Sequence, residues 1–400
     1  MASHSSLSDL PVELLAMIAS LLPPKDLLPL RRTCRSLEYA TLDVFASVHF
    51  SEKAFIFSDP RSMQALVSIA NHAVFSRQLK RLELSFVELA TAAKARTIRQ
   101  SEVTHTRTGR ALRGSVEAGY ATTLCRQREF YRFKRTVILA EALRNLQASG
   151  RQPAIIALGS DADDKSLLPC GYRSMASAVG DPRLIEIPDY NETAFCNIYR
   201  GISLANFPIS KLQLGSWQRG VPLNMFRCSG VVLRFPHLTD LELTIAPGDV
   251  NDAHPVPLRL ITGRSMFHPS DLDAFSSFLL SAPNIRTLSL AIDQVDYGLH
   301  GTTVWELADE EDFTLLPDLR ELHLAGFLLT PRHILDFVVS RKSKLRKIHL
   351  QQVRDQWLVH DGVDEHLRQI LSDHADIDVK IEDSWNGPWL FSWAAEAGLV

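Results

Sequence analysis

The feature that most constrains the fold of this chain is a recurrent apolar spacing, L-x-x-L-x-L, in which isoleucine replaces some of the leucines. Its six occurrences are Leu79/Leu82/Leu84, Ile209/Leu212/Leu214, Leu238/Leu241/Leu243, Ile285/Leu288/Leu290, Leu319/Leu322/Leu324 and Leu345/Ile348/Leu350. Because side chains alternate between the two faces of a strand, the last two apolar residues of each motif share one face. The spacing therefore predicts a strand at each motif, and six motifs are far more than chance allows.

Helical periodicity separates these predicted strands. The apolar residues of two expected helices are Leu272, Phe275, Phe278 and Leu279 within Asp271 to Leu280, and Ile334, Leu335, Phe337 and Val338 within Thr330 to Val339. Further strands that lack the full motif are expected at Ile155 to Leu158 and at Ile377 to Ile381. Alternating strands and helices predict an α/β fold with a parallel sheet that lines a curved solenoid, in which each unit buries its neighbour's apolar face.

Polar residues stand between the paired apolar residues of each motif and point to the opposite face of the strand. They are Glu83, Gln213, Glu242, Ser289, His323 and His349. This row is a candidate surface for a target protein, and a merely solvated sheet face is an equally good interpretation. If His323 and His349 lie on adjacent strands, they supply two metal ligands; because the sequence offers no third, we expect no metal site.

The first fifty residues have the pattern of a separate helical module. An apolar stripe between Leu10 and Leu22 predicts a first helix, which the pair Pro23-Pro24 ends. A second helix is expected with Asp26 as its N-cap, and a third, short one near Leu42. Three short helices cannot bury faces this apolar by themselves, so either the rest of the chain or a partner must cover them.

Two runs of this module carry a recognisable motif: Leu10-Pro11-x-Glu13-Leu14-Leu15-x-x-Ile18-x-x-x-Leu21 and Asp26-Leu27-Leu28-x-Leu30-Arg31-x-x-Cys34-Arg35-x-Leu37. The motif resembles an F-box, which implies a three-helix F-box domain at residues 1–50 that binds a Skp-type adaptor and, through it, the cullin of a ubiquitin ligase. By position, the resemblance implies apolar contacts to the adaptor or within the module for Leu10, Pro11, Leu14, Leu15, Ile18, Leu21, Leu27, Leu28 and Leu30. The alternative is a helical cap on the following domain.

Residues 51–400 look like the irregular leucine-rich-repeat domain of divergent fungal F-box proteins. That resemblance implies a substrate-recognition subunit of a Skp-cullin-F-box ubiquitin ligase, in which the repeats hold an unknown target protein. A different class of function remains open, namely a non-catalytic leucine-rich-repeat scaffold without a role in ubiquitin transfer.

Two segments interrupt or end the predicted repeats. Between about residues 94 and 135 there are eleven Lys or Arg against three Glu. This basic insertion predicts a loop followed by a helix with Phe130, Phe133, Val137, Ala140 and Leu143 on one face. It could bind nucleic acid, although a solvated insertion is the favoured interpretation. At about residues 383–400, Trp385, Trp389 and Trp393 predict a C-terminal cap on the last repeat.

Composition and motifs exclude several other classes. A formal net charge of -3 gives no overall attraction to nucleic acid or to anionic membranes. The five cysteines are odd in number and widely separated, which predicts free, buried thiols in a reducing compartment. We find no signal peptide, no membrane-spanning run and no catalytic or cofactor-binding motif. We therefore expect a cytoplasmic or nuclear protein that is not an enzyme and needs no cofactor.

Overall fold

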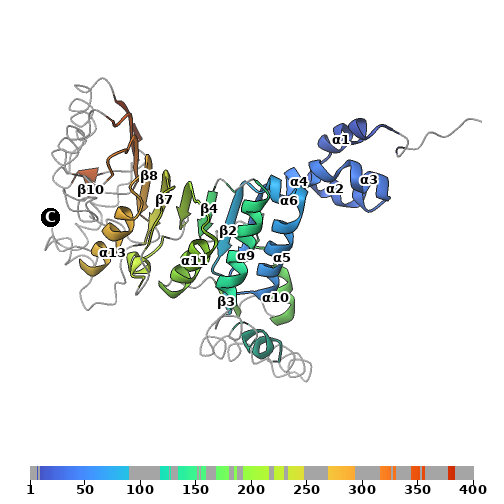
Figure 1. The fold of residues 1–400 in the computed structure, drawn as a ribbon, viewed down its shortest axis with the longest axis horizontal. Helices are drawn as coiled ribbons and strands as arrows, with labels where there is room; N and C mark the ends of the chain where they lie inside the picture. The colour runs from blue at the N-terminus through green and yellow to red at the C-terminus, as the bar shows by residue number, and fades with distance from the viewer. Residues whose placement is uncertain are drawn as a thin grey trace, which may run out of the picture. The chain divides into compact units, whose positions relative to one another are not determined.

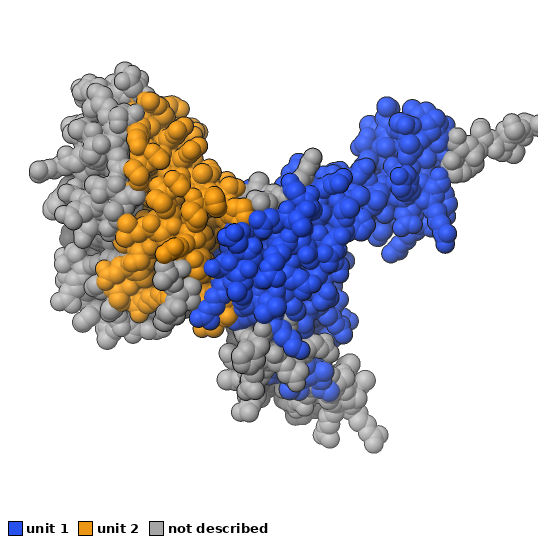
Figure 2. Space-filling model, viewed as in Figure 1, with its two compact units in different colours: residues 1–188, 200–207 blue, residues 189–199, 208–400 orange. Residues whose placement is uncertain are grey.

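The computed structural model describes residues 7, 10–89, 118–125, 127, 134–150, 153, 155–158, 168–179, 184–186, 192–215, 220–228, 233–246, 269–292, 316–325, 328–329, 344–351, 354–355 and 377–382. It divides into two compact units, which Figure 2 shows in blue and orange. Unit 1 comprises residues 1–188 and 200–207, and unit 2 comprises residues 189–199 and 208–400.

Unit 1 begins with four short helices, drawn in blue in Figure 1: α1 (Val12–Ser20), α2 (Pro24–Arg31), α3 (Arg35–Ala40) and α4 (Leu42–Phe50). The prediction of three helices was wrong, because the second periodic segment breaks at Cys34, whose backbone is extended. Just before the break, the Thr33 hydroxyl donates to the Leu30 carbonyl at 2.7 Å, a local bond that competes with helix continuation. The N-cap of α2 is Pro23 and not Asp26, which lies inside the first turn.

The rest of unit 1 is a small α/β assembly. Its elements are β1 (Glu52–Ile56), α5 (Pro60–Asn71), α6 (Ala73–Gln78), β2 (Arg81–Ser85), β3 (Glu88–Leu89), α9 (Arg135–Ala148), β4 (Ile155–Leu158), α10 (Tyr172–Val179) and β5 (Ile185–Glu186). Strands β1, β2 and β4 pair in parallel, while β3 and β5 form a short antiparallel pair. Helix α5 packs against both α9 and β1, so one face of the parallel strands is covered by helices (Figure 1).

Unit 2 contains most of the predicted strands. Helix α11 (Glu192–Ala205) spans the boundary between the units, and the later elements are β6 (Lys211–Leu214), the 3-10 helix η4 (Leu223–Phe226), β7 (Asp240–Ile245), α13 (Pro269–Leu280), β8 (Thr287–Ile292), β9 (Glu321–Ala325), β10 (Leu328–Leu329), β11 (Lys347–Gln351), β12 (Arg354–Asp355) and β13 (Asp378–Glu382). Strands β6, β7, β8, β9, β11 and β13 pair in that order and all in parallel. The strands expected at the motifs, at 155–158 and at 377–381 are present.

The register of unit 2 explains the repeated spacing. Each motif places its middle apolar residue opposite that of the next strand, in a row that runs Leu212, Leu241, Leu288, Leu322 and Ile348. All five side chains are buried. The strands are also linked where they begin, since the backbone amides of Asp240 and Thr287, the first residues of β7 and β8, donate to the carbonyls of Ser210 and Thr239, which precede β6 and β7. The apolar residues therefore stack from strand to strand as a continuous core.

Aromatic residues fill the space beside this core. The rings of Phe226 in η4 and Phe278 in α13 are stacked, with their centroids 4.5 Å apart. The ring of Phe195 in α11 meets that of Phe226 edge-on, with a centroid distance of 5.5 Å. Phe235 also contacts Phe278 at 5.5 Å. The predicted apolar face of the 271–280 helix is confirmed at Phe275, Phe278 and Leu279, all of which are buried.

The cysteine prediction was wrong in part. Cys196 of α11 and Cys228, which follows η4, form a disulfide with their Cα atoms 5.6 Å apart. Of the three free cysteines, Cys34 and Cys125 are exposed and Cys170 is half-buried. Widely separated cysteines were expected to stay apart, but the fold of unit 2 brings two of them together although 32 residues separate them in sequence.

The helix predicted to follow the loop of the basic insertion is α9. Its buried face was predicted correctly at Ala140 and Leu143 and incorrectly at Val137. Ala140 and Leu143 are buried, together with Leu139, whereas Val137 is 56% exposed. Several predictions fall outside the described residues: those for residues 94–117, for Phe130 and Phe133, for a helix at 330–339, and for a C-terminal cap at 383–400 with its three tryptophans. Within the described part of the chain, no helix has the length and apolar character required to cross a membrane.

Candidate functional site

The first helix exposes a row of large apolar side chains. The exposed fraction is 43% for Leu14, 60% for Met17 and 81% for Leu21, and their spacing of three or four residues brings them onto one face of the helix. Leu10, 38% exposed, lies just before the helix. Val12 on α1 and Leu28 on α2 are also exposed. We call the surface formed by Leu14, Met17 and Leu21 the apolar face; Val12, two residues before Leu14, points to the other side of the helix. The concentration of apolar side chains on the apolar face is typical of a docking surface.

The opposite side of α1 holds the helices together. Leu15 packs with Leu37 and Ala40 of α3 in a small buried cluster, which Leu30 of α2 borders. Leu27 is completely buried. Of the two kinds of contact predicted for these leucines, Leu15 and Leu27 therefore make those within the module and not those to a partner. Of the other predicted contact residues, Leu10, Pro11, Leu14, Leu21 and Leu28 are exposed, while Ile18 and Leu30 are half-buried.

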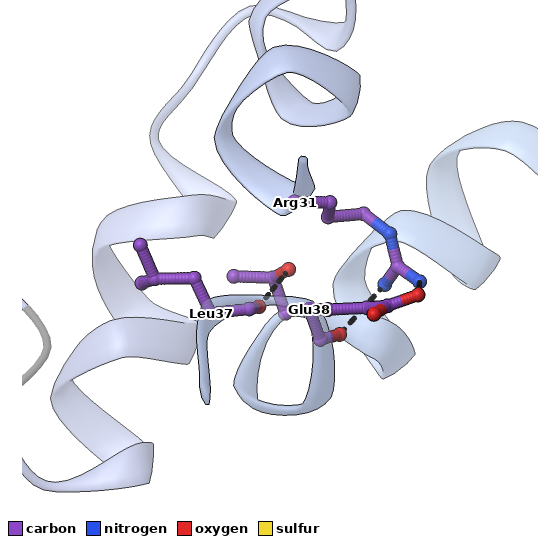
Figure 3. Close-up of polar contacts among 4 residues, drawn as sticks. Arg31, Leu37 and Glu38 are labelled. Carbon is purple, nitrogen blue, oxygen red and sulfur yellow. Dashed lines mark hydrogen bonds and ion pairs between the residues drawn. The ribbon is translucent and has the colours of Figure 1, made fainter. Parts of the chain in front are cut away.

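Arg31, the last residue of α2, contacts both α3 and α4. Its guanidinium donates to the backbone carbonyl of Glu38 at 3.0 Å and lies 3.9 Å from the Glu38 carboxylate (Figure 3). It also lies over the Phe45 ring of α4, 4.4 Å from the ring centroid. Burial lowers the pKa of Arg31, and the nearby Glu38 opposes that shift. In the same helix as Glu38, the Leu37 carbonyl accepts a 2.7 Å bond from the buried Thr41 hydroxyl. The contacts of Arg31 fix the positions of α2, α3 and α4 relative to one another.

The fourth helix connects this module to the rest of unit 1. Phe50 of α4 stacks on Phe75 of α6 with ring centroids 4.2 Å apart, and Phe75 stacks in turn on His72 at 3.9 Å. His49 lies 3.2 Å from the Pro24 carbonyl, and burial lowers its pKa more than this bond raises it. The module thus attaches through α4, while the apolar face lies on α1.

Comparison with known families identifies this module. Residues 7–48 match the F-box-like family model. The F-box-like domain thus covers all four helices except the end of α4, and it contains the entire apolar face. F-box domains typically bind Skp-type adaptors. A search of curated proteins found no significant match to the chain.

Sequence reasoning alone did not separate the two sides of this F-box-like domain. It also missed the exposed residues Val12 and Met17, of which Met17 belongs to the apolar face. A signal for Met17 was present, because Leu10, Leu14, Met17 and Leu21 follow helical spacing. Tyr39, 78% exposed on α3, and Val48 on α4 are further exposed apolar residues of the domain.

The predicted polar row is assembled in unit 2. Gln213, Glu242, Ser289, His323 and His349 occupy the same register position on consecutive strands from β6 to β11, and Lys380 continues the row on β13. The Gln213 side chain donates to Glu242 at 2.8 Å. Glu83 lies on β2 of unit 1, where its register neighbours are Ala54 and Ala157.

The two histidines of the row are direct neighbours. Their Nδ1 atoms are 3.4 Å apart, and the Nε2 atom of His323 lies 3.7 Å from the Glu321 carboxylate. Burial lowers the pKa of His323, with smaller contributions from His349 and Lys347 in the same direction, while Glu321 raises it. In the described part of the chain there is no group of three or more His, Cys, Asp or Glu side chains that could hold a metal ion.

Proposed function

We propose that this protein is the substrate-recognition subunit of a Skp-cullin-F-box ubiquitin ligase. The F-box-like domain would dock the Skp-type adaptor, and the adaptor would connect the chain to a cullin. The remaining α/β part would act as an irregular leucine-rich-repeat domain that holds a target protein. In this role the protein is not an enzyme, needs no cofactor, and acts in the cytoplasm or the nucleus.

The observation that carries this proposal is the apolar face within the segment that matches the F-box-like family. Removing apolar surface from water contributes about 25 cal/mol per Å², so a partner that covers Leu14, Met17 and Leu21 gains binding free energy from each of them. The buried cluster around Leu15 and Leu37 shows that these helices have an interior of their own. The exposed side chains are therefore not needed to close it.

The leucine-rich-repeat assignment is supported by the spacing and register of unit 2. Its strands are parallel, and the apolar residues of the motif form buried rows across them. Parallel strands of this kind, with polar residues on the other face, are typical of repeat proteins that bind partners on the sheet. The polar row from Gln213 to His349 is the part of that face proposed to contact a target.

The proposed contribution to ubiquitin transfer is proximity. A target held on the same assembly as the ubiquitin donor reacts as if in an intramolecular step, which removes much of the entropic cost of an encounter. This chain would supply the two binding surfaces and no reacting group.

The test is direct binding of the full chain to a purified Skp-type adaptor. We expect a stable complex that is weakened at least about a hundredfold by Leu14→Asp combined with Leu21→Asp, because two carboxylates would be buried in an apolar contact. Isothermal titration calorimetry measures the affinity, and circular dichroism checks that the variant remains folded.

A matched control is Val137→Asp combined with Leu204→Asp. These residues are 56% and 57% exposed, on α9 and α11, outside the F-box-like domain. The control should bind the adaptor as the unchanged protein does. No complex with the unchanged chain, or equal affinity of the Leu14/Leu21 variant, would show that the proposal is wrong and would favour a scaffold without an adaptor.

A further inference from the structure

The strongest feature outside the F-box-like domain is the histidine pair on β9 and β11. His323 and His349 are register partners on neighbouring parallel strands, so their side chains leave the same face of the sheet. Both are half-buried, and the buried residues on either side of them in each strand point to the opposite face. The fold therefore holds the two rings next to each other without help from a loop.

The distance between the rings is informative. The two Nδ1 atoms are 3.4 Å apart, which is longer than the roughly 2.7–3.2 Å of an ordinary hydrogen bond from an N–H group. Two nitrogens bonded at about 2.1 Å to one tetrahedral metal ion are about 3.4 Å apart. The ring centroids are 5.4 Å apart and the rings are inclined by 78°, so the rings are not stacked face to face.

Glu321 provides a second observation. Its carboxylate lies two residues before His323 on β9 and faces the Nε2 atom at 3.7 Å, on the other side of the ring from His349. A carboxylate at one ring nitrogen favours the tautomer with the proton on that nitrogen, so the lone pair remains on Nδ1. The same arrangement of carboxylate, histidine and metal is common in metal sites.

We propose that His323 and His349 form a two-ligand site for a divalent transition metal, with zinc as the physiological candidate. Glu321 is a positioning residue that orients His323. The proposed site departs from the expectation of no metal site, which rested on the missing third ligand. The described residues hold no group of three ligands, and the register neighbours Ser289 and Lys380 add none, so the site has two protein ligands and binds more weakly than a zinc site with three or four. Water, or a side chain of a bound protein, fills the other positions. The proposal does not depend on adaptor binding by the F-box-like domain.

The test is isothermal titration calorimetry at pH 7.5. Zinc chloride is titrated into the full chain, which has first been freed of metal with a chelator, and the heat of binding is measured. We expect one equivalent of zinc that is lost in His323→Asn and in His349→Asn, and that is retained in His237→Asn, a variant of an exposed histidine elsewhere in unit 2. Glu321→Gln should keep the stoichiometry and weaken the affinity about tenfold. Circular dichroism confirms that each variant is folded.

Copper provides an independent spectroscopic readout, because imidazole ligands bind Cu²⁺ more tightly than Zn²⁺. Electron paramagnetic resonance of one added equivalent of Cu²⁺ should show coupling to two imidazole nitrogens, and to one in His323→Asn. The proposal is overturned if zinc does not bind, if both histidine variants bind zinc as the unchanged chain does, or if the copper spectrum shows fewer than two histidine nitrogens.

Discussion

Arg31 illustrates how a single residue supports the F-box-like domain. Its side chain is 10% exposed and contacts α3 through the Glu38 carbonyl and α4 through the Phe45 ring. A buried guanidinium needs such partners, because an unpaired charge away from water is costly. Glu38 itself is 62% exposed, so its carboxylate contributes little as an ion-pair partner. The hydrogen bond from Arg31 to the backbone carbonyl of Glu38 therefore stabilises the domain more than the ion pair does.

We predict that Arg31→Ala lowers the free energy of unfolding by about 2 kcal/mol, because it removes a charged hydrogen bond and the packing on Phe45. Glu38→Gln should change it by less than about 0.5 kcal/mol, since the backbone carbonyl is retained. Urea denaturation measures both changes. The exposed Arg32 offers a control, Arg32→Ala, and an equal loss in that variant would contradict the prediction.

At the scale of single elements, the strands were the most predictable part of the fold. The L-x-x-L-x-L spacing located β2, β6, β7, β8, β9 and β11, because a buried strand of a parallel sheet needs apolar residues at alternate positions. Helix α11 was missed, although Ala194, Phe195, Ile198, Tyr199 and Ile202 are buried at helical spacing and that pattern was readable.

The docking side of α1 was not predictable in the same way. Both sides of this helix are apolar, with Leu15 and Ala19 inside and Leu14, Met17 and Leu21 outside. A sequence pattern indicates that a helix is apolar, but only the position of the neighbouring helices determines which side they cover. The disulfide was missed for a related reason, since a contact over 32 residues depends on the whole of unit 2.

The disulfide leads to a prediction about α11 and the segment after η4. Closing a loop between cysteines 32 residues apart restricts the unfolded chain and so stabilises the folded state by about 4 kcal/mol. Reduction, or Cys196→Ala, should therefore lower the stability of unit 2 by about that amount in chemical denaturation, while Cys34→Ala has no effect. Thiol titration of the denatured, unreduced protein should find the three free cysteines and not all five; five reactive thiols would contradict the bond.

At the scale of the whole molecule, the question is whether the F-box-like domain is a docking module or a structural cap. The answer depends on how the domain is attached to the rest of unit 1. Helix α4 packs against α6 and β1, and Phe50 covers Phe75. Directly after α4, the carbonyl of Ser51 accepts bonds from the amides of Lys80 and Arg81 at 2.8 and 3.0 Å. Helix α4 is therefore part of the support of β1 and β2, whereas α1 carries the apolar face.

This arrangement predicts different results for two truncations. Deleting residues 1–40 removes α1 to α3 and should leave the rest of the protein folded, because α4 still covers α6. Deleting residues 1–50 also removes Phe50 and should lower the free energy of unfolding by a further 2 kcal/mol or so, the order expected for losing a stacked aromatic side chain. Thermal denaturation followed by circular dichroism compares the two. If the shorter deletion already unfolds the parallel sheet, the N-terminal helices act as a cap, and the proposed adaptor docking loses its structural basis.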